Sequence, residues 1–216
     1  MRIALVHDWL DTPGGGELVL AQLLRVYPDA DLHTLVDFLT EAERRDLGLP
    51  AARTTPLQRL PGARRWFRAA VVLRPQLIER IDVRDYDLVI SDSHAIAKGA
   101  RTRAGQVHIC YCHTPIRYYW SHYEEYRRNP QFGKLNSLVR LAMTFFVPAQ
   151  RKADYDAAQN VDVFIANSTE VQKRIKQYYD KPSTVIHPPV DVDRFTPART
   201  RGDYYVVTGR QVPYKR

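Results

Sequence analysis

The sequence has few of the features that mark secreted, membrane-spanning or zinc-binding proteins. Its two cysteines, Cys110 and Cys112, are too few for the disulfide framework of a small secreted domain. No apolar run approaches the roughly 20 residues that a membrane-spanning helix needs. The first apolar run is short and ends at His7 and Asp8, so it is unlike the apolar region of a signal peptide. Together these absences indicate a cytoplasmic protein.

Signatures of metal binding and nucleic-acid binding are missing as well. Cys110 and Cys112 alternate within one predicted strand and therefore point to the same face of the sheet. Two such ligands without a second pair do not form a zinc site, so we expect buried thiols. The sequence contains no helix-turn-helix, zinc-finger or RNA-recognition pattern. The formal net charge of +8 nevertheless indicates an anionic partner: a nucleic acid, a phosphorylated substrate or a membrane surface.

What the chain does contain is a regular alternation of strand-like and helix-like segments. Of its 216 residues, 44% are hydrophobic and 26% are charged, as in an ordinary globular protein with a substantial core. The alternation predicts an α/β fold with a parallel sheet and helices on both faces, and ligands of such sheets bind beyond the carboxyl ends of the strands. The expected strands are Ile3–Val6, Asp31–Asp37, Asp87–Ser91, Gln106–Cys112, Val161–Ala166 and Thr184–His187.

The expected helices are bounded by capping residues and prolines. Thr40 is a typical cap for a short helix that runs through Glu43 and Arg45, and Pro75 breaks or kinks a longer helix. Between these two helices, prolines at positions 50, 56 and 61 mark an irregular crossing. The other expected helices are one that begins at Glu17, Ala63–Ile81 with the break, residues 132–159 as one helix or two interrupted near Pro148, and Ser168–Tyr179 with Ser168 or Thr169 as its cap.

Three consecutive glycines separate the first strand from the first helix. Gly14, Gly15 and Gly16 can adopt backbone angles that are closed to other residues, and they allow a ligand close to the main chain. The unpaired amides and the positive dipole at the start of the helix suit a phosphate. No Gly-Lys-Ser/Thr follows, and Gly-x-Gly-x-x-Gly is absent, so this is neither a P-loop nor a dinucleotide-binding turn. A turn that only reverses the chain is the alternative.

Polar residues follow several predicted strands. His7 and Asp8 follow the first strand, Ser91 to His94 the third, His113 the fourth, and Asn167 with Ser168 the fifth. Because these ends share one edge of a parallel sheet, the pattern predicts a ligand cleft there. A histidine at a strand end is also a common structural residue, so for each of the three histidines both roles stay open.

The end of the chain resembles the start of another domain. His187 begins a rigid Pro-Pro segment, and Tyr204–Thr208 is a strand-like run that cannot bury itself alone. Arg210 and Lys215 follow this run. A planar guanidinium and a point charge facing the cleft would together suit a diphosphate.

A basic and aromatic group lies in the first half of the chain. Arg64, Arg65, Trp66 and Arg68 are its centre, Phe67 lies between them, and Arg59 and Arg74 flank them. Arginines interleaved with aromatic residues on a helix suit the surface of an anionic bilayer. A solvated basic face whose aromatic residues belong to the core is the alternative.

Several motifs together resemble retaining glycosyltransferase family 4. The resemblance covers the whole chain in order, and the motifs are weak individually but specific in combination. They are Gly14-Gly-Gly-Glu17, Tyr111-Cys-His-Thr-Pro115, Ala166-Asn-Ser168, Ile186-His-Pro-Pro-Val-Asp191 with the later Phe195, and Gly209-Arg-x-x-x-x-Lys215.

The resemblance implies the GT-B architecture, in which two Rossmann-like domains enclose a cleft. Residues 1–190 would be the amino-terminal, acceptor-side domain, residues 191–202 the connection, and residues 203–216 the first strand and loop of a donor-nucleotide domain. The segment Arg117-Tyr-Tyr-Trp120 after His-Thr-Pro is similar to mannosyltransferases of polysaccharide assembly, which favours a GDP-mannose donor. The implied acceptor is a glycan or a polyprenyl-linked lipid, so the location would be cytoplasmic and peripheral at the inner face of the cell membrane.

The resemblance also implies roles for individual residues. Gly14, Gly15 and Gly16, with Asp8 and Ser168, match substrate-binding positions. His113 matches a cleft histidine that contacts the donor sugar. Arg210 and Lys215 match the basic pair that stabilises charge on the departing nucleoside diphosphate, which implies transfer without a metal or other cofactor. The family's Glu-x7-Glu segment has no counterpart in these 216 residues, so we expect this chain alone to be inactive.

Two other classes of function remain at this stage. A protein that binds a sugar nucleotide without catalysis would keep the same cleft residues. A basic nucleic-acid-binding module would explain the charge and the aromatic residues, although the missing signatures argue against a nucleic-acid partner.

Overall fold

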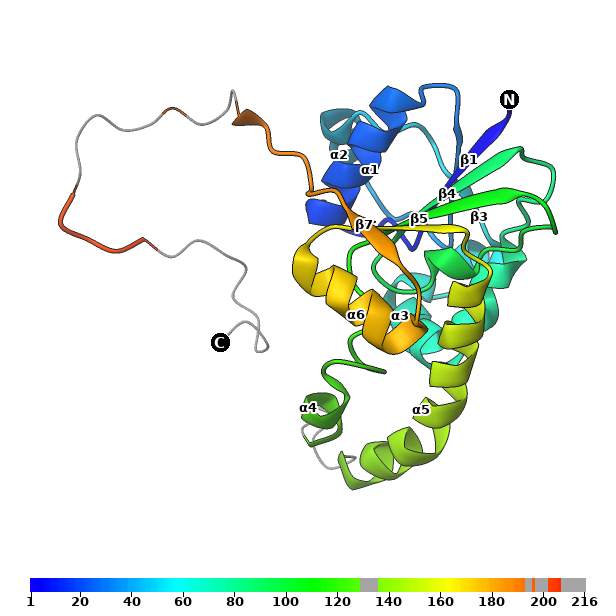
Figure 1. The fold of residues 1–216 in the computed structure, drawn as a ribbon, viewed down its shortest axis with the longest axis vertical. Helices are drawn as coiled ribbons and strands as arrows, with labels where there is room; N and C mark the ends of the chain where they lie inside the picture. The colour runs from blue at the N-terminus through cyan, green and yellow to red at the C-terminus, as the bar shows by residue number, and fades with distance from the viewer. Residues whose placement is uncertain (129–135, 193–195, 197–201, 207–216) are drawn as a thin grey trace.

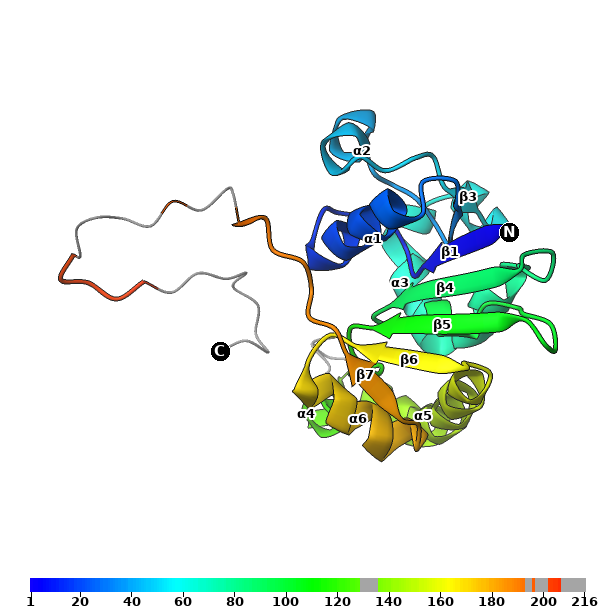
Figure 2. The same ribbon diagram turned by 45° about the horizontal axis from the view of Figure 1, so that its top comes forward.

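The structure is a computed structural model, and it describes residues 1–128, 136–192, 196 and 202–206. Its centre is a seven-stranded sheet in which every pair of neighbouring strands is parallel (Figures 1 and 2). The strands are β1 Ile3–His7, β2 Asp31–Thr34, β3 Arg53–Thr54, β4 Leu88–Ser93, β5 Val107–Cys112, β6 Val163–Ala166 and β7 Ser183–Val185. They are ordered β3-β2-β1-β4-β5-β6-β7.

The strand order reverses direction between β1 and β4. From β1 the chain builds outward through β2 to β3, and it then returns to place β4 on the other side of β1. In doubly wound sheets the crevice at such a reversal is the usual ligand site. β4 is buried along its whole length, including Ser91, Asp92 and Ser93. A central strand that ends in buried polar groups therefore borders this crevice.

Helices cover both faces of the sheet. The α-helices are α1 Gly15–Val26, α2 Glu41–Leu47, α3 Ala63–Leu73, α4 Tyr123–Arg128, α5 Asn136–Gln159 and α6 Thr169–Tyr179. Three short 3-10 helices are η1 Pro56–Arg59, η2 Pro75–Arg80 and η3 Ala97–Gly99. These elements confirm the predicted α/β, Rossmann-like fold.

Alternating residues of the strands divide the core into two faces. Leu5 and Ile90 pack with Leu20 and Leu24 of α1 on one face. Ala4, Val6 and Val89 point to the other face, where the core includes residues of α3, η2 and α5. Cys110 and Cys112 are free, buried thiols that pack with α5 and α6, as the alternation within β5 predicts.

A buried ion pair fixes the segment after β4 against the helical layer. Lys98 Nζ of η3 lies 2.5 Å from Asp154 Oδ1 of α5, and both side chains are almost fully buried. Trp120 and Tyr179 donate hydrogen bonds to Oδ2 of the same carboxylate at 2.7 and 2.8 Å. Burial opposes the charge of Lys98, but Asp154 outweighs it and raises the pKa of the lysine. Such a pair is costly to break from one side, because the other charge is then buried without a partner.

The local predictions are mostly confirmed, with some differences in length. Thr40 caps α2 in a full capping box with Glu43, and the helix from Ala63 ends before Pro75. β2 is shorter than the predicted Asp31–Asp37, since Leu35 and Val36 bond instead to the loops after β1 and β3. α5 runs without interruption through Pro148 in its described part, which settles the two alternatives in favour of one helix.

Some elements were not predicted, and one prediction fails in part. β3 and α4 are absent from the predicted elements. Tyr204 to Val206 are exposed and form no strand, so the predicted strand is wrong for these residues, and its remainder lies outside the described residues. No helix in the described part of the chain has the length and apolarity to cross a membrane.

Candidate functional site

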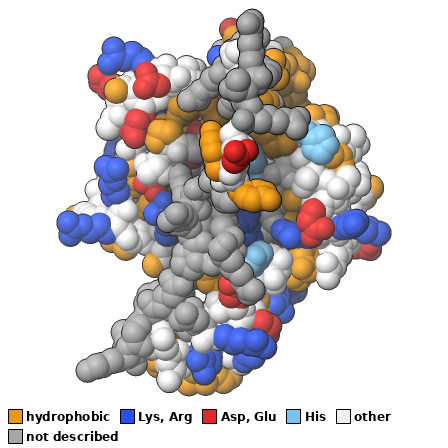
Figure 3. Space-filling view, turned by 90° about the vertical axis from the view of Figure 1, so that its left-hand side faces the viewer, with side chains coloured by type: hydrophobic (Ala, Val, Ile, Leu, Met, Phe, Trp, Pro, Cys, Tyr) orange, Lys and Arg blue, Asp and Glu red, His pale blue; other side chains and the backbone are white. Residues whose placement is uncertain are grey.

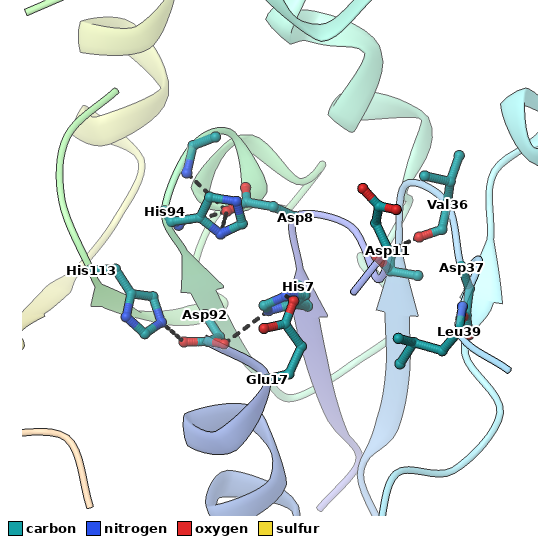
Figure 4. A network of polar contacts seen from close by, with 12 residues as sticks. His7, Asp8, Asp11, Glu17, Val36, Asp37, Leu39, Asp92, His94 and His113 are labelled. Atoms are coloured by element: carbon teal, nitrogen blue, oxygen red, sulfur yellow. Dashed lines mark hydrogen bonds and ion pairs between the residues drawn. The ribbon is translucent and has the colours of Figure 1, made fainter. Parts of the chain in front are cut away.

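The predicted ligand edge of the sheet is occupied by a compact polar cluster. His7 is the last residue of β1 and pairs in register with Asp92 of β4. His113 directly follows β5, and its amide bonds to Ser93 O of β4 at 2.8 Å. These residues converge from the strands beside the reversal point, as Figure 4 shows.

Asp92 bridges the two histidines. His7 Nδ1 lies 2.9 Å from Asp92 Oδ2, and His113 Nε2 lies 2.7 Å from Asp92 Oδ1 (Figure 4). His7 and Asp92 are completely buried, whereas the His113 side chain is 13% exposed. A carboxylate can only accept, so Asp92 fixes a proton on the facing nitrogen of each ring. The bridge thereby orients His113, which is the member of the bridge that reaches solvent.

The cluster carries ionised groups despite its burial. Burial opposes protonation of His7, but the hydrogen bond to Asp92 and the negative charges of Asp92 and Glu17 outweigh it and raise the pKa of His7 to about 10. Burial would likewise raise the pKa of Asp92, yet His113 and His7 lower it. His7 is therefore a buried imidazolium between two carboxylates at neutral pH.

Glu17 links this cluster to the start of α1. Its Oε1 lies 3.8 Å from His7 Nε2, an ion-pair distance that is too long for a hydrogen bond. The carboxylate is in the first turn of the helix, where the helix dipole favours negative charge. Burial opposes ionisation of Glu17, but His7 outweighs it, so the pKa of Glu17 is lowered.

The glycine turn lies directly over the two histidines. A Cβ added at Gly16 would be 3.6 Å from His7 Cε1 and 3.9 Å from His113 Nε2, whereas one added at Gly15 would meet no atom within 4 Å. None of these three glycines has a positive φ, and the cap residue Gly14 is extended. The expected unusual backbone angles are therefore wrong. The absence of side chains matters instead, because it leaves space at Gly15 and Gly16 beside His113, while the Glu17 carboxylate lies at the same end of α1.

Asp8 has a different role from the one predicted. It is completely buried, and its oxygens accept hydrogen bonds from the amides of residues 94 to 97 at 2.5–2.8 Å. His94 Nδ1 also lies 2.9 Å from Asp8 Oδ2. Burial would raise the pKa of Asp8, but His94 outweighs it and the pKa is lowered. Asp8 thus holds the loop after β4 and is not placed to contact a substrate.

The remaining predicted residues are divided between the described and undescribed parts of the chain. Ser168 caps α6 by accepting from the Val171 amide at 3.3 Å. It is half-buried at the same edge of the sheet, and contact with a substrate stays a prediction. Arg210 and Lys215 lie outside the described residues, so their roles stay predictions as well.

The predicted membrane cluster is partly built into the fold. Phe67 and Val71 are core residues, and Trp66 is half-buried, with its Nε1 donating to Pro61 O at 3.0 Å. Arg68 forms an ion pair with Asp11, whereas Arg64 and Arg65 are exposed. The aromatic residues here therefore serve packing, as the alternative interpretation expected.

Sequence reasoning did not select Asp92 and Glu17 as site residues. Asp92 lies between two serines at the end of a buried strand, and burial of a charge is rare unless it is paired. That signal was available in the sequence. The partnership with His7 was not, because it depends on the register between β1 and β4.

The cluster offers an anion site next to an oriented imidazole. The amides at the start of α1 can bind phosphate oxygens in competition with the Glu17 carboxylate, and His113 can exchange a hydrogen bond with a ligand hydroxyl. Among the described residues, no group of three or more His, Cys, Asp and Glu side chains is placed to hold a metal ion. Figure 3 faces this edge of the molecule, and it shows separate histidine side chains at the surface, with basic and acidic side chains scattered over the same face.

Comparisons with known proteins agree with this geometry. Residues 13–194 match the model of the family described as Glycosyltransferase Family 4. The crystal structure of Anabaena HepE in complex with UDP is similar at 17% identity and a TM-score of 0.50, covering 89% of this chain and 45% of that one. Anabaena HepE in complex with UDP and glucose is similar at 18% identity and a TM-score of 0.50, covering 92% and 47%.

These similarities have limited extent. The chain spans about half the length of the solved structures that it matches. No match was found among curated proteins. At this level of identity, the likeness to HepE concerns the fold.

Proposed function

Because this chain belongs to glycosyltransferase family 4, we propose that it forms the acceptor-side half of an enzyme that transfers a sugar from a nucleotide sugar to a glycan or polyprenyl-linked acceptor. Its partner half would be a donor-nucleotide domain that begins near residue 203 and follows the connection 191–202. We refer to this chain together with that second domain as the complete protein. The family match over residues 13–194 supports this proposal.

The chemistry of the cluster fits such a reaction. In glycosyl transfer the bond between the anomeric carbon and a phosphate oxygen breaks, the acceptor oxygen bonds to that carbon, and the acceptor proton ends on the phosphate. Negative charge therefore grows on the departing diphosphate. The first amides of α1, beside Gly15 and Gly16, are an uncharged electrostatic partner for that group. In this proposal, Arg210 and Lys215 supply its positive charge, and no metal or other cofactor is required.

His113 is the residue that we assign to the sugar. It is the member of the His7–Asp92–His113 bridge that reaches solvent, and Asp92 keeps its Nε2 protonated. An oriented imidazole can hydrogen-bond a sugar hydroxyl without reorganising during the reaction. This position of His113 at the end of β5 is the observation that carries the proposal.

We propose a retaining mechanism with GDP-mannose as the favoured donor. The support for mannose is the segment Arg117-Tyr-Tyr-Trp120 after His113. HepE, whose structure contains UDP and glucose, makes a UDP sugar the competing donor. The proposed location is the cytoplasm, peripheral to the inner face of the cell membrane.

The test is nucleotide release and product formation by the complete protein with a panel of donors. GDP-mannose, UDP-glucose and other common nucleotide sugars are offered with a lipid extract as the source of acceptor. We expect product that depends on the donor and reaches its highest rate with GDP-mannose. Faster transfer from UDP-glucose would replace the donor assignment, and absence of transfer from every donor would leave a binding protein.

A further inference from the structure

Positive charge is concentrated in two segments of the sequence. Residues 47–78 and residues 126–153 contain 12 of the 32 Lys and Arg residues and none of the 24 Asp and Glu residues. The remainder of the chain therefore has a negative formal charge. The first segment contains α3, and the second contains most of α5.

These two segments meet on the surface of the described structure. A shallow hollow between η2 and α5 is lined by Arg74, Gln76, Leu77, Arg80, Phe146 and Gln150. Arg80 lies just beyond the first segment, next to the exposed Glu79. Arg74 and Arg80 are both exposed, and neither pairs with a carboxylate among the described residues. Their charges are therefore available to an anionic partner.

Apolar side chains are exposed next to these arginines. Phe146 lines the hollow and is 54% exposed, and Phe145 is 73% exposed. Leu138 and Leu141, at 63% and 57%, continue the same end of α5. Residues 138, 141 and 145 have the spacing of one helix face. We call Leu138, Leu141, Phe145 and Phe146 the α5 apolar patch.

We propose that the α5 apolar patch, with Arg74 and Arg80, docks on an anionic lipid bilayer. Large apolar side chains beside arginines are the pattern of an interfacial surface, because the apolar groups enter the acyl boundary while the guanidinium groups bind lipid phosphates. In a symmetric dimer, a second copy would bring its own arginines against this positive surface. Charge complementarity thus favours lipid over a second copy.

This surface shares Arg74 with the basic and aromatic group that the sequence indicated, but its other residues are different. Trp66 and Arg68 are engaged within the fold, whereas the α5 apolar patch presents its side chains to solvent. The inference deepens the proposed function, since a polyprenyl-linked acceptor would be presented at such a membrane. Its test measures lipid contact and does not depend on sugar transfer.

The test uses an environment-sensitive fluorophore on single introduced cysteines of the complete protein. The two native cysteines are buried, so labelling selects the new thiol. Phe145→Cys reports on the α5 apolar patch. Val26→Cys is the control, because Val26 is 67% exposed at the end of α1, on the other face of the sheet. Vesicles contain either phosphatidylcholine alone or phosphatidylcholine with phosphatidylglycerol.

We expect the label at residue 145 to shift to the blue and brighten with the anionic vesicles, while the label at residue 26 does not change. Arg74→Glu with Arg80→Glu should weaken the apparent partition by about tenfold or more, as should salt at about 0.5 M. Arg25→Glu, a charge reversal on α1, should not. Circular dichroism of each variant checks that it is folded.

Three results would overturn the proposal. The first is no response at residue 145, or an equal response at residue 26. The second is a blue shift without vesicles that grows with protein concentration, which would assign the patch to a second copy. The third is a blue-shifted label at every concentration without vesicles, which would mean that another part of the complete protein covers the patch.

Discussion

At the scale of single residues, the site is defined as much by missing side chains as by present ones. Gly15 has open space where a side chain would project, and Gly16 lies close above His7 and His113. The buried His7–Asp92 pair below them is ionised and fixed. A ligand at this edge would therefore meet the start of α1 with its Glu17 carboxylate, and the oriented imidazoles of His113 and His94.

Gly15→Ala separates stability from function. The residue has a helical backbone and no atom near the added Cβ, so we expect the 216-residue chain to gain up to about 1 kcal/mol of unfolding free energy. In the complete protein the same methyl group would occupy space needed by the ligand. The rate of sugar transfer should therefore fall at least about tenfold, which corresponds to an activation free energy that is higher by roughly 1.4 kcal/mol. Chemical denaturation and steady-state kinetics measure the two effects.

Gly48→Ala is the matched control. Gly48 ends α2 with φ of 67° and is also surrounded by open space. An alanine there should destabilise the chain by about 1 kcal/mol and leave transfer unchanged. Unchanged transfer in Gly15→Ala would remove the glycine turn from the ligand site.

His7 predicts a particular dependence of stability on pH. Its pKa is about 10 in the folded protein and near the ordinary 6.5 when unfolded. Because the folded pKa is the higher one, its stabilising contribution is complete below about pH 6.5 and is lost as the pH rises through 10. The groups that face it are Asp92, Glu17 and His94.

The test compares denaturant unfolding of the unchanged chain and of His7→Gln between pH 7 and pH 9. As the pH rises, the unfolding free energy of both proteins is measured. That of the unchanged chain should fall more steeply than that of His7→Gln, by roughly 1 kcal/mol for each pH unit. Parallel curves for the two proteins would show that His7 is neutral when folded.

At the scale of elements, the sequence predicts local structure better than it predicts contacts between residues that are distant in the chain. A helix cap or a proline acts on the few residues next to it in the chain. The boundaries predicted from Thr40, Pro75 and Ser168 are all confirmed. β3 was missed because two residues are too few to show a period. Asp8 was misassigned because its partners, the amides after β4, are distant in sequence.

In the candidate site, too, residues within short motifs were predicted and contacts between distant strands were not. His113 and the glycine turn were identified from motifs that lie within short segments. The Asp92 bridge requires β1, β4 and β5 to be adjacent and in register, and only the assembled sheet provides that. Arg210 and Lys215 remain predictions from motif alone.

Ser168 can be tested as a helix cap and as a substrate contact in one comparison. Ser168→Ala and Thr40→Ala each remove a side-chain cap, so each should lower the unfolding free energy of the chain by about 1 kcal/mol. Only Ser168→Ala should also raise the KM of the complete protein for a substrate. Equal kinetics of the two variants would reduce Ser168 to a cap.

At the scale of the whole molecule, the cluster is one side of a proposed cleft. It holds amides, an imidazole and buried ion pairs at the switch point of the sheet, but its basic residues for a diphosphate are predicted only after residue 208. We therefore expect residues 1–216 alone to show negligible transfer. Turnover by this chain at a rate ordinary for enzymes, roughly 1 per second or more, would mean that no second domain is needed.

The central claim is that His113 and Lys215 act on the two ends of the bond that breaks. Steady-state kinetics of the complete protein with varied donor tests it most directly, with Lys173→Ala on the exposed face of α6 as a control. Lys215→Ala should lower kcat a hundred- to thousandfold, or about 3 to 4 kcal/mol, with a smaller change in donor KM, because the charge that it opposes grows as the bond breaks. His113→Ala should lower kcat to a degree that depends on the sugar offered. If His113→Ala leaves transfer unchanged with every donor, or Lys215→Ala changes KM alone, the account of this site is contradicted.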